Sequence, residues 1–349
     1  MVRDRLVGLG ARAARGPLSA ALIGALEQGA PWRRGVLAIL TYHRVNDPFA
    51  RPDLLPGLLS ATPAAFAEQI EDLAHHYRPV SMAEVLESID DPRRLPPRAV
   101  HVTFDDAYAD FATHAWPILR ARNVPATLFV PTAYPDSGGP GFWWDRLWHA
   151  VSTTARDAVG VEPGGRFELG ELGDLAARRA AMRTLQASIK AQPHDEAMAD
   201  VERLVLELGD TSDTAAIQPP PAVLGWDALR ELAADGVTLA PHTRHHPLLT
   251  RVPIDTAVEE IAGARVDLER EIGLTPAVLA YPSGAHNHIA VEAARRAGMV
   301  LGVTTDRGGN DLRHADRLRL RRINVGGRAR SPLVRAQLAW ASTLGARRR

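Results

Sequence analysis

The sequence predicts an α/β fold, namely a distorted seven-stranded (β/α) barrel with a helical insertion. Seven short runs rich in apolar and β-branched residues recur along the chain, and segments with helical spacing lie between them. Several runs are almost continuously apolar, which is typical of parallel strands buried on both faces. Strands that alternate with helices favour a parallel barrel over an antiparallel sandwich. The expected strands are 36–43, 99–104, 126–130, 237–242, 277–282, 301–305 and 318–325.

The composition excludes several classes of protein. The 349 residues contain 41 basic and 41 acidic side chains, so the chain carries no global footprint of nucleic-acid binding. It has no cysteine, which rules out disulfides, thiolate metal ligands and a cysteine nucleophile. Any metal ion must therefore be held by His, Asp or Glu. Lys190 is the only lysine, so arginine supplies nearly all of the positive charge.

Helix signals organise the remainder of the chain. The helix expected over 62–77 begins with a Thr62 cap and Pro63, and those over 225–236 and 288–299 close on Gly236 and Gly298. Asn287 is the expected cap at the start of the last of these helices. Residues 143 to about 221 show helical patterns and no convincing strand, which indicates a helical insertion after the third strand. The predicted organisation is an N-terminal helical extension (1–35), a barrel (36–330) and a C-terminal helix with a basic tail (331–349).

The N-terminal segment is open to two interpretations. Scattered arginines precede a short apolar stretch over 17–26, as in a weak signal peptide or a membrane-surface helix. We favour an amphipathic helix packed against the domain, because Glu27 and Gln28 interrupt the apolar run. No apolar run approaches the roughly 20 residues of a membrane span. The expectation is a cytoplasmic or membrane-surface protein, with peripheral membrane association through this helix.

Two adjacent carboxylates end the second expected strand, in the stretch "HVTFDDAYADF" (101–111). Asp105 and Asp106 repel one another unless a cation or a division of labour offsets the repulsion. The alternative is structural, since an Asp at this place can cap the helix that follows.

A histidine-rich stretch, "APHTRHHPLL" (240–249), follows another expected strand. His242 and His246 stand four residues apart, so one helical turn would put both imidazoles on one face, with His245 as the competing choice. Two histidines and a carboxylate are a common ligand set for zinc or a related divalent ion. The alternative is a polar loop that happens to be rich in histidine.

The two stretches reinforce one another. The C-terminal ends of parallel strands form one shared rim, so Asp106 can complete a His-His-Asp metal site. Asp105 then stays free to accept a proton from the attacking water. The cation also offsets the repulsion between the two carboxylates. This combination predicts metal-assisted hydrolysis.

These residues also resemble a known family. "TFDDAYADF" (103–111), "HTRHHPLL" (242–249) and "LAYPSG" (279–284) are similar to the three motifs of the polysaccharide deacetylases, carbohydrate esterase family four. The resemblance extends from about Val36 to about Val325 and implies removal of acetyl groups from sugar polymers. By that resemblance Asp105 is the general base, and the backbone N–H of Tyr108 helps to stabilise the oxyanion. The implied metal ligands are Asp106, His242 and His246, and the implied metal is Zn²⁺, with Co²⁺, Ni²⁺ or Mn²⁺ as alternatives.

The chain departs from the family pattern in two places. Ala280 stands where many members carry an arginine that orients the base, and Arg321 or Arg322 is a substitute. The usual C-terminal Leu-x-x-His segment, which gives the general acid, is not evident. However, "LTYHRV" (40–45) resembles the N-terminal motif of the poly-N-acetylglucosamine deacetylase branch, so we assign the acid role to His43 and keep His286 in reserve.

The expected substrate is an N-acetylated polysaccharide or glycan precursor. "FWWDRLWHA" (142–150) resembles a Trp-rich stretch of the same branch, in which Trp143 or Trp144 could stack on a sugar ring or pack in the core. Tyr281 and Pro282 of the third motif are further expected substrate contacts. Two alternatives remain: a catalytically silent carbohydrate-binding protein on the same fold, and an amidohydrolase acting on a small non-sugar amide.

Overall fold

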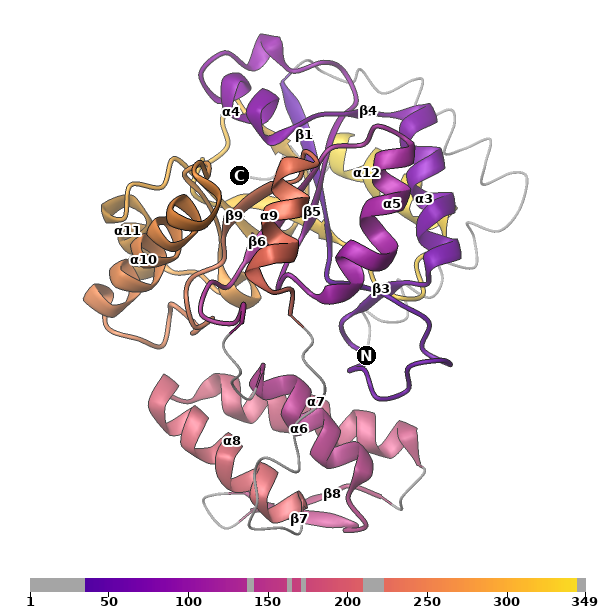
Figure 1. Cartoon of the computed structure of the whole chain (residues 1–349), viewed down its shortest axis with the longest axis vertical. Helices are drawn as coiled ribbons and strands as arrows, with labels where there is room; N and C mark the ends of the chain where they lie inside the picture. Colours follow the sequence, from indigo (N-terminus) through magenta and orange to yellow (C-terminus); the bar gives the residue numbers. More distant parts are fainter. Residues whose placement is uncertain (1–34, 137–140, 162–164, 171–173, 210–222, 344–349) are drawn as a thin grey trace.

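A nearly closed barrel of seven parallel strands forms the centre of the molecule, as predicted (Figure 1). The computed structural model describes residues 35–136, 141–161, 165–170, 174–209 and 223–343. Around the barrel the strands follow the order β10-β11-β13-β1-β5-β6-β9. Their bounds are β1 Val36–Tyr42, β5 Ala99–Phe104, β6 Ala126–Val130, β9 Thr238–Pro241, β10 Val278–Ala280, β11 Leu301–Arg307 and β13 Leu320–Asn324.

The central pair, β1 and β5, shows why these residues form a barrel interior. The two strands run parallel in register from Leu37 opposite Ala99 to Tyr42 opposite Phe104, and every residue of both is buried. Such strands have no solvent-facing side, so near-continuous apolar runs are required. Two short strands extend the sheet: β4 (Arg78–Pro79) lies parallel to β5, and β12 (Asn310–Asp311) antiparallel to β1.

Side chains bridge the seam of the barrel between β9 and β10. No strand pairing joins these two strands among the described residues. Instead, the Thr275 hydroxyl donates to the carbonyl of Leu239 at 2.8 Å, and His242 Nδ1 contacts the carbonyl of Ala280 at 2.7 Å. A histidine of the second motif therefore helps to close the barrel.

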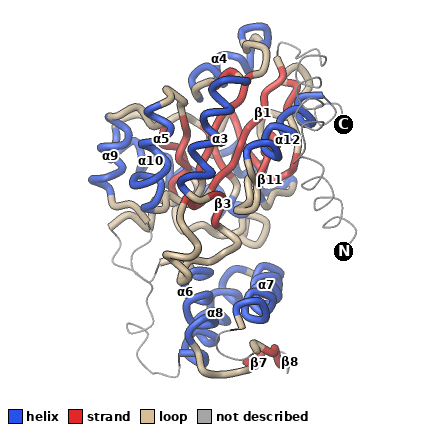
Figure 2. The backbone as a smooth tube through the Cα atoms, turned by 90° about the vertical axis from the view of Figure 1, so that its right-hand side faces the viewer, coloured by secondary structure: helices blue, strands red, loops and turns tan. Residues whose placement is uncertain are grey.

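Helices cover the outside of the barrel (Figure 2). As expected, Thr62 caps the first described helix by accepting from the N–H of Ala65, and Asn287 caps α11 by accepting from the N–H of Ala290. The bounds are α3 Pro63–His76, α4 Met82–Asp90, α5 Trp116–Ala121, α9 Trp226–Ala234, α10 Ile254–Ile272, α11 His288–Arg296 and α12 Ser331–Thr343. Short helical segments are η1 Pro92–Arg94, η2 Phe111–Ala115 and η4 Pro282–Gly284.

The helix after the two aspartates begins later than its sequence suggests. Asp106 and Ala107 have positive φ angles of 73° and 50°, which no right-handed helix allows. A π-helical turn, η2, therefore precedes α5. The delay leaves both carboxylates on a turn at the rim.

The insertion forms a separate layer below the barrel (Figure 1). It contains α6 (Trp143–Thr153), α7 (Leu175–Ala191) and α8 (His194–Gly209), which pack around a core of their own centred on Trp148. The expectation of an insertion without strands is wrong, because β7 (Ala158–Val161) and β8 (Gly165–Glu168) form an antiparallel hairpin. Strands of four residues are too short to show the alternation by which a strand is recognised.

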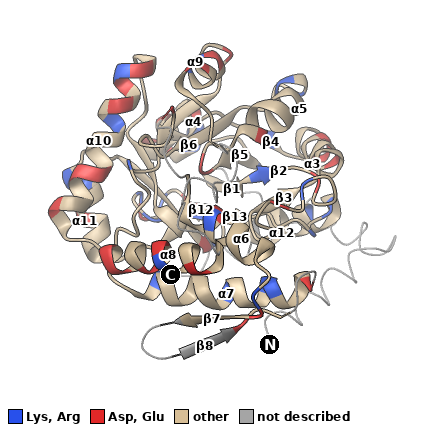
Figure 3. Cartoon of the chain, turned by 60° about the horizontal axis from the view of Figure 1, so that its bottom comes forward, with Lys and Arg blue, Asp and Glu red and all other residues tan. Residues whose placement is uncertain are grey.

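The outer surface carries charges of both signs. Figure 3 shows acidic and basic residues interspersed along α10 and α11. On α10, Arg265 and Glu269 pair at 2.8 Å. Among the described residues, no helix combines the length and apolar character needed to cross a bilayer. The expected N-terminal helix (1–34) and the basic tail beyond Thr343 lie outside the described residues.

Candidate active site

Three buried side chains converge at the barrel rim and can hold a metal ion. Asp106 follows β5, and His242 and His246 follow β9; one ligand atom from each lies within 4.8 Å of the others. The Nε2 atoms of both histidines are 3.4 Å from the same oxygen, Oδ1 of Asp106. In the described part of the chain this is the one group of three or more such side chains close enough to share a metal ion.

The spacing and chemistry of the three donors fit a divalent ion. Ligand atoms about 2.0–2.1 Å from a tetrahedral zinc lie about 3.3 Å from one another, close to the observed separations. A neutral His242 that donates from Nδ1 to Ala280 presents an unprotonated Nε2 to Asp106. Two imidazole nitrogens and one carboxylate oxygen match the preferences of zinc and of neighbouring transition metals.

The electrostatics of His246 and Asp106 also suit a metal site. Burial, together with the neighbouring His242, lowers the pKa of His246 to about 3, so this imidazole is neutral at physiological pH. Burial raises the pKa of Asp106, but His242 and His246 outweigh it and hold that pKa below its ordinary value. Neutral imidazole and ionised carboxylate are the forms that bind metal.

Strained backbone brings the two histidines together, rather than the helical turn that their spacing suggested. β9 ends at Pro241, and residues 242–250 form a loop in which Thr243 and His246 have φ angles of 64° and 58°. Positive φ in non-glycine residues is costly and clusters at functional sites. Five of the eight such residues described lie in the three motifs: Asp106, Ala107, Thr243, His246 and Ser283.

Asp105 is paired with a buried arginine and does not cap a helix. Arg322 on β13 donates from Nη1 and Nη2 to the two oxygens of Asp105, at 2.8 and 2.7 Å. Burial raises the pKa of Asp105, but the Arg322 guanidinium outweighs it and lowers that pKa. Of the two arginines considered from the sequence, Arg322 is therefore the one that pairs with Asp105.

His43 lies on the other side of Asp105. Its Nε2 is 4.0 Å from Oδ2 of Asp105, and the side chain is 26% exposed at the rim. The backbone N–H of His43 donates to the hydroxyl of Ser60 at 3.0 Å, which fixes the chain where β1 ends. An imidazole next to the Asp105 carboxylate and in contact with solvent can exchange protons with a bound molecule.

A buried polar network joins the insertion to the rim, and it was not foreseen from the sequence. Trp144 donates to the hydroxyl of Tyr108, which donates to Asp145, at 2.8 and 2.9 Å. Arg44 lies 4.1 Å above the ring of Tyr108 and pairs with Asp110 at 2.8 Å. The network joins three stretches that are far apart in the sequence, around Arg44, Tyr108 and Trp144, so only the fold reveals it.

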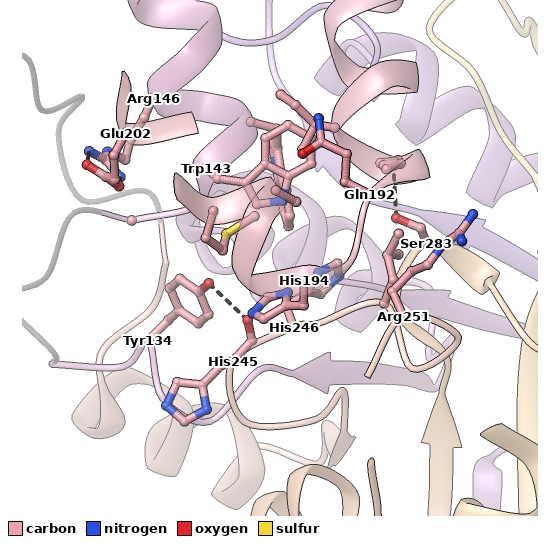
Figure 4. A pocket seen from close by; sticks show the side chains of 17 residues that line it. Tyr134, Trp143, Arg146, Gln192, His194, Glu202, His245, His246, Arg251 and Ser283 are labelled. Carbon is pink, nitrogen blue, oxygen red and sulfur yellow. Dashed lines mark hydrogen bonds and ion pairs between the residues drawn. The ribbon is translucent and has the colours of Figure 1, made fainter. Parts of the chain in front are cut away.

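The network holds aromatic rings against His246, one of the three candidate metal ligands. The ring of Trp144 lies 4.8 Å from His246 and stacks on Phe142 at 4.5 Å. Trp144 is thus buried as a support of His246, the packing alternative named for it above. Trp143 is half-buried and lines a cavity beside His246 (Figure 4).

The other expected site residues lie elsewhere. Tyr281 and Pro282 are buried, Tyr281 among the residues packed between the barrel and α10 and α11, so neither side chain is available to a substrate in this structure. His245 is exposed and bonds Glu260 at 2.7 Å, which leaves it outside the metal cluster. His286 contacts the carbonyl of Gly284 at 3.0 Å and Asp306 at 3.7 Å.

Comparison with known proteins identifies the family. The family model described as "Polysaccharide deacetylase" matches residues 93–162 and 187–302, which is more than half of the chain. The protein therefore belongs to the polysaccharide deacetylase family. Over 108 residues it is 35% identical to the poly-beta-1,6-N-acetyl-D-glucosamine N-deacetylases of Escherichia coli K12 and O157:H7. That stretch is 31% of this chain and 16% of each relative, and it supports the resemblance to this branch.

Solved structures share the fold. The Streptococcus pyogenes deacetylase PplD, in complex with acetate, aligns with a TM-score of 0.59 and 20% identity, over 88% of this chain and 99% of its own. The deacetylase domain of Bordetella bronchiseptica BpsB aligns at 0.53 and 19% identity, over 84% and 97%. IcaB from Ammonifex degensii aligns at 0.52 and 18% identity, over 87% and 97%.

Removing the guanidinium of Arg322 should show how much a buried, unpaired Asp105 destabilises the fold. We expect Arg322→Met to lower the free energy of unfolding by about 3–5 kcal/mol, because an uncompensated carboxylate is left inside the barrel. Adding Asp105→Asn should restore much of that loss. Urea unfolding of the metal-free single and double variants measures both effects. If the losses of the two single substitutions simply add in the double variant, Asp105 and Arg322 are not energetically coupled.

Asp145 should make stability depend on pH. Burial raises its pKa to about 6, so between about pH 4 and pH 6 the folded state binds more protons than the unfolded state. Stability due to this group therefore falls as pH rises through that window. The Asp145→Asn variant cannot ionise at this position. Its free energy of unfolding minus that of the wild type should therefore rise by on the order of 2–3 kcal/mol between pH 4 and pH 7. Urea unfolding of metal-free protein at both pH values tests this, and an unchanged difference would refute it.

Proposed function

We propose that this protein is a divalent-metal-dependent deacetylase that hydrolyses N-acetyl groups of a polysaccharide or glycan precursor. The observation that carries the proposal is the separation of roles between adjacent carboxylates. Asp106 joins His242 and His246, whereas Asp105 faces away toward Arg322 and His43. Family membership and the poly-N-acetylglucosamine deacetylases among the relatives support the choice of substrate class.

Asp105 is the proposed general base. Asp106, His242 and His246 would hold a divalent cation, which would supply Lewis acidity toward the acetyl carbonyl and toward water. Asp105 accepts the proton of the attacking water, and Arg322 holds both carboxylate oxygens so that the base stays ionised and aligned. The backbone N–H of Tyr108 is proposed to donate to the developing oxyanion, and the buried Tyr108 ring anchors that peptide.

His43 is the proposed general acid. The acetamide nitrogen must gain a proton before it leaves as an amine, and His43 lies at the exposed edge of the site. Proton transfer from His43 to this nitrogen releases the amine, and the acetyl group leaves as acetate. Asp105 and His43 thus flank the reacting carbon with opposite proton-transfer roles.

The first test is acetate release from N-acetylglucosamine oligomers. Metal-stripped protein is compared with protein reloaded with zinc, cobalt, nickel or manganese. We expect acetate only after reloading, because the ligand set has the chemistry of a catalytic cation. Stoichiometric metal binding without acetate from glycan oligomers or small acetamides would favour the silent carbohydrate-binding alternative. Release from the small amides alone would favour the amidohydrolase.

Paired variants separate the base from the ligands. Asp105→Asn should retain stoichiometric zinc and lose about 10²–10⁴-fold in kcat, because only the base is removed. His246→Ala should weaken zinc binding by at least about 100-fold, and activity should fall as a consequence. Zinc affinity is measured by competition with a chelator and kcat by acetate release. Normal turnover by Asp105→Asn would eliminate its role as base.

The acid role of His43 can be tested through the leaving group. His43→Ala should lose about 100-fold or more in kcat on an acetamide, whose amine must be protonated, and far less on an aryl acetate ester, whose phenolate leaves unaided. His286→Ala is the matched control, because its imidazole is held by Gly284 and Asp306. Equal losses on amide and ester would remove the acid role from His43.

A further inference from the structure

A cavity of about 230 Å³ opens beside His246, between the insertion and the barrel (Figure 4). Trp143 and Trp144 of α6 line it, and so do residues at the end of α7 and the start of α8. Its remaining boundary is formed by the loop after β9 and by Ser283 of the third motif. The cavity therefore adjoins the metal ligands and is built largely from the insertion.

The charged side chains of this cavity do not balance. Its lining contains three arginine or lysine side chains, Arg146, Lys190 and Arg251, and one carboxylate, Glu202. Glu202 is bonded to Arg146, with Nη2 2.8 Å from Oε2. Within the part of the chain that the structure describes, neither Lys190 nor Arg251 has a carboxylate within ion-pair distance. The cavity therefore offers two cations that form no ion pair with a described carboxylate.

Lys190 is the better placed of the two cations. The only lysine of the chain, it lies in the last turn of α7 and is half-buried, with its Nζ 3.1 Å from the hydroxyl of Ser283. Burial lowers the pKa of Lys190, which means that the folded chain opposes its charge there. Asp106 partly offsets this effect, but a partly desolvated cation with no carboxylate in contact still gains from an anion that a ligand brings.

Arg251 lies across the cavity on the barrel side. Its carbonyl accepts from the N–H of His194, at 3.4 Å, so its backbone meets the start of α8. Its guanidinium is exposed and unpaired among the described residues, and Figure 4 shows it next to Ser283. A guanidinium matches the planar geometry of a carboxylate or a phosphate.

We propose that this cavity is a subsite for an anionic group on the glycan, a carboxylate or a phosphate, bound by Lys190 and Arg251 next to the acetamide that is hydrolysed. Trp143, half-buried in the same wall, offers an apolar face to the sugar that carries the charge. The position of the acetamide rests on the proposed function above. An acidic or phosphorylated N-acetylated glycan is then bound in preference to a neutral homopolymer, which remains a weaker substrate.

The competing explanation is purely structural. Lys190 could serve only to tie the insertion to the barrel through Ser283. In that case its removal would affect neutral and anionic ligands alike. Arg251 makes no such tie with its side chain, so both cations together distinguish the two explanations.

The test measures binding rather than turnover. Calorimetric titrations use the full-length, zinc-loaded Asp105→Asn protein, so that the probes are not consumed. The carboxylate arm compares a tetrasaccharide of alternating glucuronate and N-acetylglucosamine with neutral N-acetylglucosamine tetrasaccharide. The phosphate arm compares N-acetylglucosamine 1-phosphate with N-acetylglucosamine. We expect at least one anionic probe to bind about tenfold or more tightly than its neutral counterpart.

Three substitutions locate that preference. Lys190→Met and Arg251→Gln should each reduce the ratio of neutral to anionic dissociation constants by about tenfold. Arg183→Met is the matched control, because it removes one positive charge from an exposed position of α7 outside the cavity, and it should leave the ratio as it is. Urea unfolding checks that Lys190→Met still folds, and Arg251→Gln provides an independent measurement at an exposed side chain.

Equal affinity for neutral and anionic probes would overturn the subsite, and so would a preference that survives both cavity substitutions. Direct coordination of the anion by zinc would give that second outcome. These results are distinct from a failure of the proposed function, which would appear as absent acetate release from the wild type even if anion binding through Lys190 and Arg251 is found.

Discussion

Two buried carboxylates on adjacent residues impose the main electrostatic constraint on this protein. Asp105 and Asp106 both lie at the end of β5, where neither can be neutralised by solvent. The structure meets the constraint with two separate partners: a guanidinium from β13 for one carboxylate, and two imidazoles from the loop after β9 for the other. These partners come from opposite sides of β5 in the barrel. The nearly closed parallel sheet therefore brings a separate partner to each carboxylate, which reduces the free-energy cost of burying both.

The same arrangement gives the two carboxylates different chemistry. Asp105 is held through both oxygens by an arginine, so it is aligned and ionised without being a metal ligand. Asp106 faces two imidazoles, one of which also bridges the open seam of the barrel to Ala280. His242 thus belongs both to the candidate metal site and to the closure of the barrel, which couples the geometry of that site to the fold.

The insertion shapes the site from outside the barrel. Through Tyr108 and Asp145 it is bonded to the rim, and through Trp144 it packs against His246. Its next helix carries Lys190 to the same edge of the cavity. The insertion therefore supplies side chains beside His246 that the barrel itself does not provide.

From the sequence alone, the strand positions, the caps at Thr62 and Asn287, and the grouping of Asp105, Asp106, His242 and His246 could be predicted. These features depend on local periodicity and on the rule that parallel strands end at one rim. Only the tertiary structure decided that Arg322 pairs with Asp105, that positive-φ turns replace a helical turn at His246, and that Tyr281 is buried. It also brought Lys190 beside the metal ligands. Those facts arise from contacts between residues far apart in the chain, about which local spacing carries no information.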